Sequence, residues 1–197
     1  MGRPLTGSGP EGWDGDRYQQ RFDDLAGAGV DVHGEVEFVL RFRPTTVLDA
    51  GCGTGRVARE LADRGVEVVG VDVDRSMIDT ARRLAPGLEW LVADLAGLDL
   101  GRRFAVVVMA GNVPLFTPPG TEAAVVDACA RHVSDDGHLV AGFQLDRGYN
   151  VARYDHDCSA AGLILESRWV TWSGEPWEDA ATYAVSVHRP DRVSPPS

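Results

Sequence analysis

The stretch VLDAGCGTG, residues 47–55, decides how this chain folds. Thr46, Val47 and Leu48 favour a short strand, and glycine then occupies positions 51, 53 and 55. Because glycine adopts positive φ and has no Cβ, the chain can turn sharply from a strand into a helix, and a ligand can lie against the main chain. The stretch therefore predicts a strand, a tight turn that binds a nucleotide-like ligand, and a helix.

The spacing of the glycines narrows the kind of ligand. It is G-x-G-x-G with Asp49 two residues before the first glycine, whereas the dinucleotide fingerprint is G-x-G-x-x-G and would require glycine where Arg56 stands. The segment from Asp49 to Gly55 resembles the first motif of class I S-adenosylmethionine-dependent methyltransferases. A nicotinamide-dependent dehydrogenase is the alternative that this spacing disfavours.

Composition excludes several other classes of protein. The chain has 197 residues, of which 44% are hydrophobic, so one domain can bury a sizeable core. The net charge is −11, and all 19 basic residues are arginine. Without lysine, a phosphate loop with its lysine and a pyridoxal Schiff base are both excluded. The acidic excess also argues against a broad nucleic-acid-binding face.

The cysteine pattern and the hydropathy predict a cytoplasmic protein. Cys52, Cys129 and Cys158 are odd in number, far apart and without metal-site spacing, which favours free thiols in a reducing compartment. No apolar run is long enough to span a membrane, and the first residues lack the order of a signal peptide. We expect neither a membrane partner nor a metal.

Strand and helix patterns alternate along most of the chain. We predict a tail over residues 1–12, one domain over 13–189 with an N-terminal helical lid over 13–44, and a second tail over 190–197. Apolar strands near 46–48, 66–71, 88–93, 104–109 and 138–143, separated by helix-length gaps, indicate a parallel α/β sheet. Asp136-Gly137 is expected to form a turn before the fifth strand.

The end of the chain departs from this alternation. A helix over 150–161 is followed by strands near 163–172 and 181–188 with no helix between them, which predicts an antiparallel hairpin. Seven strands ending in such a hairpin resemble the class I methyltransferase sheet. The predicted fold is a Rossmann-like three-layer α/β sandwich whose seven-stranded sheet is mostly parallel, with an antiparallel last strand.

Acidic residues end three successive predicted strands. Asp49, Asp72 and Asp94 fall where an open α/β sheet binds its ligands, beyond the carboxyl ends of the strands. A single acid at such a position commonly caps the next helix. Three in succession beside a glycine loop favour a ligand site.

The resemblance implies a role for most of these residues. Asp72 would accept hydrogen bonds from both ribose hydroxyls, and Met77 would pack on the adenine. Asp94 and the backbone of Leu95 would lie at the adenine amino group.

The methionine end of the cofactor would meet a second group of residues. Asp49 would lie beside it, the N–H groups around Gly51 and Gly53 would contact it, and carbonyl groups at Ala110 and Gly111 would bind its amino group. The complete set of cofactor-binding candidates is Tyr18, Arg21, Asp49, Gly51, Cys52, Gly53, Asp72, Val73, Met77, Asp94, Leu95, Ala110 and Gly111.

Catalytic residues are harder to assign. Cys52 has no neighbouring base that would activate it as a nucleophile, so we interpret it as a small loop residue. Asn112 begins a segment with only a faint similarity to the Asn-Pro-Pro-aromatic motif of amino-methylating enzymes, because Val113 replaces the first proline. His33 precedes a helix in the lid, where it is a candidate base or an ordinary surface histidine. His33 and Asn112 are therefore the catalytic candidates.

These features predict an S-adenosylmethionine-dependent methyltransferase that transfers a methyl group to a small-molecule acceptor by in-line displacement. Holding the acceptor atom close and aligned can supply much of the acceleration, so an obligate base is not required. Two alternatives remain: a non-catalytic protein that binds S-adenosylmethionine, and a methyltransferase for protein or RNA.

Overall fold

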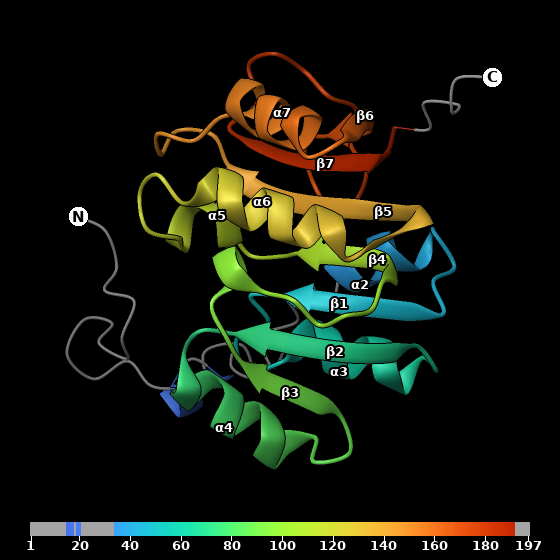
Figure 1. The fold of residues 1–197 in the computed structure, drawn as a ribbon, viewed down its shortest axis with the longest axis vertical. Coiled ribbons are helices and arrows are strands. Elements are labelled where there is room, and N and C mark those ends of the chain that lie inside the picture. Colours follow the sequence, from blue (N-terminus) through green and yellow to red (C-terminus); the bar gives the residue numbers. More distant parts are fainter. Residues whose placement is uncertain (1–14, 18, 21–33, 192–197) are drawn as a thin grey trace.

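The computed structural model describes residues 15–17, 19–20 and 34–191, and Figure 1 shows them as three layers. Residues 15–17 and 19–20 are helical and fall within the segment 13–44 that was expected to be helical. The later helices are α2 (Gly34–Leu40), α3 (Arg56–Asp63), α4 (Arg75–Leu84), η1 (Leu95–Gly97), α5 (Val113–Phe116), α6 (Glu122–Arg131) and α7 (Val151–Ala160). The strands are β1 (Thr46–Ala50), β2 (Glu67–Asp72), β3 (Glu89–Val92), β4 (Phe104–Met109), β5 (Val133–Gln144), β6 (Leu163–Trp169) and β7 (Tyr183–Pro190).

The described strands form one seven-stranded sheet in the order β3-β2-β1-β4-β5-β7-β6. β1 to β5 pair in parallel, and β7 lies between β5 and β6, antiparallel to both. The predicted fold class and the antiparallel hairpin are therefore confirmed. The strand order reverses between β1 and β4, which is where an open α/β sheet binds its ligands.

Helices cover both faces of the sheet. Figure 1 shows α6 and α7 in front of it and α2 and α3 behind it. Both faces of β4 are buried and need a layer of helices to cover them. Val107 and Met109 pack into the core on one face, and Val106 and Val108 pack into the core on the other. A strand that buries both sets of side chains is typical of a parallel sheet.

The sequence prediction is wrong at the start of β5. The expected turn at Asp136-Gly137 is part of the strand, which runs from Val133 to Gln144. The register shifts here, because Phe104 pairs with Val133 and Val106 pairs with His138. An irregular bulge absorbs the turn-like residues, as occurs at the ends of sheets. The short helix α5 also went unpredicted, since four residues are too few to show a helical period.

No helix in the described part of the chain has the length and apolarity needed to cross a bilayer.

Candidate functional site

The glycine loop between β1 and α3 is fixed to the end of β2. Gly51, Gly53 and Gly55 have φ values of 79°, 56° and 77°, a left-handed conformation that other residues rarely adopt. The N–H groups of Gly51 and Cys52 both donate to the carbonyl of Val71, at 2.8 and 3.0 Å. The Gly51 N–H is therefore bonded within the protein, and the expectation that N–H groups around Gly51 and Gly53 meet the cofactor stays a prediction.

Asp72, the last residue of β2, has its carboxylate fixed from two sides. Oδ2 accepts a hydrogen bond from the N–H of Gly53 at 2.8 Å, and Oδ1 accepts one from the N–H of Asp74 at 2.9 Å. The Gly53 N–H is therefore also engaged within the protein. Asp74 caps α4 by accepting from the N–H of Ser76 at 2.8 Å, so Asp72 is not the cap of that helix. Main-chain N–H groups beside the glycine loop therefore fix both Asp72 oxygens in orientation.

Asp49 lies within β1 and is 1% exposed. Its Oδ2 accepts a hydrogen bond from the N–H of Ala58, at 3.1 Å, in the first turn of α3. Burial raises the pKa of Asp49 to about 7, although the positive charge of Arg56 acts in the opposite direction. The carboxyl group is therefore buried against the first turn of α3, and its pKa is close to neutral pH.

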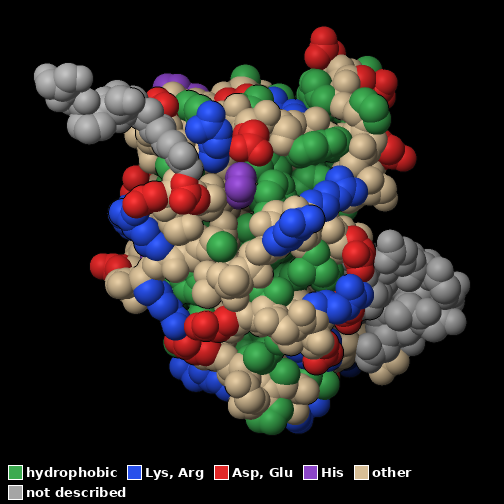
Figure 2. Space-filling view, turned by 90° about the vertical axis from the view of Figure 1, so that its right-hand side faces the viewer, with side chains coloured by type: hydrophobic (Ala, Val, Ile, Leu, Met, Phe, Trp, Pro, Cys, Tyr) green, Lys and Arg blue, Asp and Glu red, His purple; other side chains and the backbone are tan. Residues whose placement is uncertain are grey.

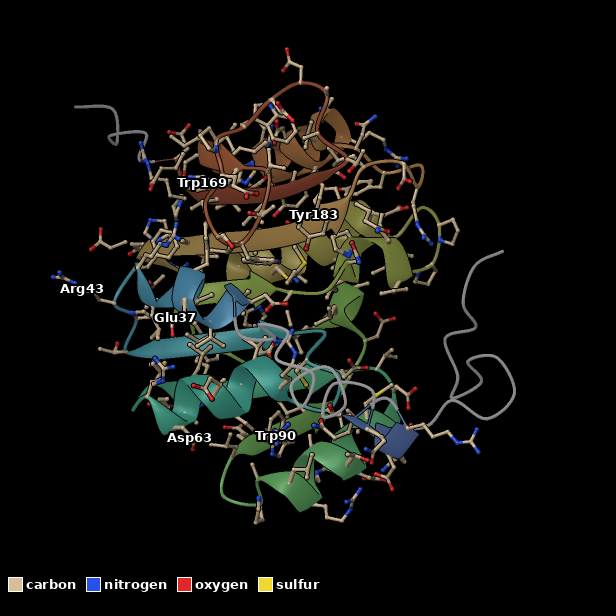
Figure 3. The ribbon with its side chains drawn as sticks, turned by 180° about the vertical axis from the view of Figure 1, so that it is seen from behind. Glu37, Arg43, Asp63, Trp90, Trp169 and Tyr183 are labelled. Carbon is tan, nitrogen blue, oxygen red and sulfur yellow. The ribbon has the colours of Figure 1, made fainter. Side chains whose placement is uncertain are left out.

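The ring of Trp90, on β3, packs against the glycine loop. A Cβ on Gly55 would lie 2.2 Å from its ring, and one on Gly70 would lie 2.3 Å from it. Its indole N–H donates to the carbonyl of Ala85 at 2.8 Å, which fixes the ring position. Figure 3 shows Trp90 on the α3 side of the sheet. Glycine at these positions is therefore required by close packing on Trp90 as well as by the turn.

An ion pair connects the glycine loop to α2. Arg56, the first residue of α3, makes two hydrogen bonds to Glu35, at 2.7 and 3.1 Å, and each side chain is only 15% exposed. Such a bidentate pair fixes both partners in orientation as well as in distance. Sequence reasoning missed this pair, and its one signal was a charged residue directly after the third glycine.

The described N-terminal residues also contact this region. The side-chain oxygen of Gln19 accepts hydrogen bonds from Thr54, in the glycine loop, at 2.8 Å and from Arg59 at 3.2 Å. Asp16 accepts a hydrogen bond from Thr80, on α4, at 2.8 Å. The candidates Tyr18, Arg21 and His33 lie outside the described residues.

The ends of β2 and β3 bring together the residues expected at the adenine. Val73 is 43% exposed, although it is apolar, whereas Met77 and Leu95 are buried. Asp94 caps η1 by accepting from the N–H of Ala96 at 3.0 Å. The N–H of Ala93 donates to the carbonyl of Asp72 at 3.0 Å, which places Asp94 close to the end of β2.

Cys52 does not have the environment of a nucleophile. Burial raises the pKa of its thiol well above the usual value, and the negative charges of Asp49 and Asp72 raise it further. The thiol therefore stays protonated, which agrees with its interpretation as a small loop residue.

The loop after β4 faces the glycine loop. A Cβ on Gly51 would lie 2.6 Å from Val113, so the two loops touch. Gly111 and Asn112 both have positive φ, at 72° and 68°, and within the described part of the chain no neighbouring group lies within 4 Å of a Cβ built on Gly111. Ala110, half-buried, connects them to β4. This loop therefore contacts the glycine loop at Val113 and leaves space for a side chain at Gly111.

Asn112 has a structural task in this loop. Its N–H donates to the carbonyl of Gly142 at 3.1 Å, and its side-chain oxygen accepts from the N–H of Gln144 at 2.8 Å. These bonds fasten the loop to the end of β5. An amide whose oxygen is engaged in this way is a poor candidate for proton transfer, so Asn112 is better described as a wall residue than as a catalytic one.

A hollow of about 600 Å³ lies at the opposite edge of the sheet, lined by residues that include Asp135, His138, Glu166 and Arg189. Figure 2 shows this amino-end face, where acidic, basic and apolar side chains are interspersed. Glu166 lies 3.5 Å from His138 and 3.4 Å from Arg189, so its carboxylate is shared between two neighbouring side chains. No group of three potential metal ligands occurs among the described residues. The sequence motifs and the strand-order reversal both place the candidate site at the other edge.

Comparison with known proteins finds a matching family and several relatives. Residues 47–137 match a family described as methyltransferase domain. Two curated relatives are a dTDP-3-amino-3,6-dideoxy-alpha-D-glucopyranose N,N-dimethyltransferase from Streptomyces fradiae, 34% identical over 58% of this chain, and a ubiquinone biosynthesis O-methyltransferase from Alkalilimnicola ehrlichii, 37% identical over 48% of it. The chain spans about half the length of these relatives or less, since the matches cover 48% and 39% of them.

The similarity to one solved structure covers almost the whole chain. A TehB-like SAM-dependent methyltransferase from Corynebacterium glutamicum is 31% identical, with a TM-score of 0.85. The alignment covers 90% of this chain and 98% of the Corynebacterium protein. Because the two proteins match over nearly their full lengths at this level of identity, the chain belongs to the family of S-adenosylmethionine-dependent methyltransferases.

Proposed function

We propose that this protein transfers the methyl group of S-adenosylmethionine to a small-molecule acceptor by in-line displacement. The observation that carries the proposal is the fixed carboxylate of Asp72 beside the glycine loop. It is held by the N–H groups of Gly53 and Asp74, at 2.8 and 2.9 Å, at a strand end where a carboxylate suits the two hydroxyls of a ribose.

The residues present fit the rest of this cofactor. Val73 supplies exposed apolar surface directly after Asp72, where an adenine ring would find a partner. Asp94 lies close to the end of β2 and has a carboxylate oxygen with which to accept from the adenine amino group. Carbonyl groups at Ala110 and Gly111 belong to the loop that contacts the glycine loop, and as acceptors they suit an ammonium group.

The cofactor supplies an electrophilic methyl group on a sulfonium. In the reaction the carbon–sulfur bond breaks as a bond from the methyl carbon to the acceptor nitrogen or oxygen forms, the electron pair goes to sulfur, and the acceptor proton is released to solvent. The task of the protein is to align the acceptor atom with that bond and to exclude water, which can account for several kcal/mol of the barrier, about 7–11 in favourable cases.

The acceptor is proposed to be a small molecule, and its reacting atom is left open between nitrogen and oxygen. The named relatives support both, since one is an N,N-dimethyltransferase and the other an O-methyltransferase. The net charge of −11 disfavours a nucleic-acid substrate. The carboxylates of Asp72 and Asp94 at the strand ends favour neutral or cationic ligands over anionic ones.

Two measurements test the proposal. Calorimetry should show saturable binding of S-adenosylhomocysteine, and wild-type protein should convert S-adenosylmethionine to S-adenosylhomocysteine faster when small amines or phenols are added. Binding without turnover over the whole acceptor panel would favour the non-catalytic alternative. Turnover with total RNA or protein but not with small acceptors would favour the other one, and absence of binding would overturn the cofactor site.

A further inference from the structure

Tyr183 stands at the edge of the sheet that carries the cofactor site. It is the first residue of β7 and pairs with Gln144, the last residue of β5. Because β7 is antiparallel to β5, its start lies at the edge where β1, β2 and β4 end. Figure 3 labels Tyr183 on the face of the sheet that α2 and α3 cover.

The hydroxyl of Tyr183 has a proton to donate. Its oxygen lies 3.0 Å from the indole nitrogen of Trp172, and since an indole N–H only donates, the Tyr183 oxygen accepts in this bond. Trp172 is its one hydrogen-bonding partner in the described part of the chain. Burial raises the pKa of Tyr183 to about 12, so the hydroxyl keeps its proton at neutral pH.

The Tyr183–Trp172 pair lies directly on β5. A Cβ on Gly142 would be 2.3 Å from the Trp172 ring and 2.7 Å from the Tyr183 oxygen. The carbonyl of the same Gly142 accepts from the N–H of Asn112 at 3.1 Å. The pair therefore adjoins Asn112, in the loop after β4. Val113, the residue that follows Asn112, contacts Gly51.

The charges of Glu35 and Arg56, beside the glycine loop, also act on Tyr183. The pKa of Tyr183, raised mainly by burial, is raised further by the negative charge of Glu35 and lowered by the positive charge of Arg56. Arg56 directly follows the glycine loop and is paired with Glu35. Tyr183 thus lies at the start of the second strand of the terminal hairpin, on the side of the glycine loop away from the adenine residues of β2 and β3.

We infer that Tyr183 is a recognition residue for the methyl acceptor, whose hydroxyl donates a hydrogen bond to an acceptor oxygen adjacent to the atom that is methylated. This inference rests on the proposed function. Trp172 orients the hydroxyl by donating to it. The recognised oxygen is not the nucleophile, because a donated hydrogen bond withdraws electron density from it. The acceptor class is therefore a neutral or cationic compound with a hydroxyl or carbonyl oxygen beside its reacting nitrogen or oxygen, such as a catechol, an aminophenol or an amino sugar.

Matched probe pairs test this assignment. Catechol is compared with phenol, 2-aminophenol with aniline, and glucosamine with cyclohexylamine, and S-adenosylhomocysteine formation is measured for each. Wild-type protein should prefer the member with the adjacent oxygen. Tyr183→Phe should lower kcat/KM for that member by about 10- to 100-fold, the effect of losing one hydrogen bond to a buried partner, and should leave the other member unaffected.

Tyr154→Phe is the matched control. Tyr154 is a buried tyrosine of α7, in the core on the other face of the sheet, and its substitution should leave the preference unchanged. Trp172→Phe is a second test variant, since it removes the N–H that orients Tyr183 and should weaken the preference even where Tyr183→Phe fails to fold. S-adenosylhomocysteine affinity should be unchanged in all three.

The outcomes separate this inference from the proposed function. Equal loss for both members of each pair, or no loss in Tyr183→Phe, overturns the role of Tyr183. If the wild-type complex with S-adenosylhomocysteine neither methylates in turnover assays nor binds in calorimetry any oxygen-bearing probe, the acceptor class is overturned and the cofactor site stands. Failure of the wild-type protein to bind S-adenosylhomocysteine overturns the proposed function itself.

Discussion

The carboxylate of Asp72 accepts a hydrogen bond from the N–H of Gly53, 2.8 Å away, and so ties the end of β2 to the middle of the glycine loop. Asp72→Asn keeps an acceptor oxygen for that bond but loses the charge that strengthens bonds to ribose hydroxyls. We expect S-adenosylhomocysteine affinity to fall by about 1.5–3 kcal/mol, measured by calorimetry.

Asp79→Asn is the control for this experiment. Asp79 is an exposed acid of α4 that pairs with Arg82 at 3.3 Å, so its change alters the net charge equally without touching the loop. Equal affinity in wild type and Asp72→Asn would remove Asp72 from the site.

Asp49 predicts an unusual dependence of stability on pH. Its carboxyl ionises near 3.8 in the unfolded chain and, because it is buried, near 7 in the folded protein. Between these two pH values, the folded state holds a proton on Asp49 that the unfolded state has released. The contribution of Asp49 to the unfolding free energy therefore falls as pH rises through this range. Above about pH 7 both states have lost the proton, and the contribution no longer changes with pH. Asp49→Asn should remove this slope.

Urea unfolding at pH 5 and pH 8 measures the effect. The stability of Asp49→Asn relative to wild type should be greater at pH 8 than at pH 5, whereas Asp63→Asn, an exposed change at the end of α3, should show no such difference. Parallel pH profiles for wild type and Asp49→Asn would contradict the prediction.

The close contact between Gly70 and Trp90 predicts that a side chain at position 70 would disturb the packing of the core. A Cβ on Gly70 would lie 2.3 Å from the indole ring, closer than real contacts allow. Gly70→Ala should therefore lower the unfolding free energy by about 1–3 kcal/mol. Gly87→Ala, with no atom within 4 Å of the new Cβ, is the matched control. Adding Trp90→Leu should make Gly70→Ala less costly than it is alone, and equal costs in both backgrounds would show that the ring is not the obstacle.

Asp155 on α7 predicts a loss of stability in acid. It accepts from Arg168 at 2.5 Å and from the nearly buried His188 at 3.1 Å. Burial alone acts to raise its pKa, but these bonds and charges outweigh burial and lower it. The stability that Asp155 contributes is therefore fully present above its unfolded value of 3.8 and is lost as pH falls through the folded pKa.

Asp155→Asn should lower the unfolding free energy by about 1–2 kcal/mol at pH 7, a figure reduced for partial exposure, and by less at pH 3. His156→Asn, the exposed neighbour on the same helix, should have little effect at either pH. Denaturant titrations at both pH values decide the matter, and a cost for Asp155→Asn that is the same at pH 3 and pH 7 would refute the ion-pair explanation.

The parts of this structure that could be predicted from sequence are those with a local cause. The bounds of β4 were predicted because Phe104–Met109 is apolar on both faces, follows two arginines and precedes Ala110-Gly111. Asp72 was predicted because a strand end and a glycine loop are both visible in the sequence. Asn150 caps α7 by accepting from the N–H of Arg153, again a local contact that agrees with the predicted helix.

What sequence could not supply depends on contacts between distant residues. Glu35 and Arg56 are 21 residues apart, and nothing in the sequence around either residue identifies the other as its partner. Tyr183 and Gly142 meet only because β7 pairs with β5. The turn-like composition near Gly137 was misleading because the pairing of Phe104 with Val133, not local preference, holds that segment extended.

The position of β7 also constrains how the protein is made. β7 is the last strand of the sheet along the chain, yet it occupies the place between β5 and β6. Until it emerges from the ribosome, β5 has an unpaired edge and β6 has no neighbour, so the nascent chain exposes backbone groups that can pair with another molecule. Synthesis of the final strand is therefore the step that protects the growing polypeptide from aggregation, and a stop codon before residue 183 should yield insoluble material even though every residue of the glycine loop is present.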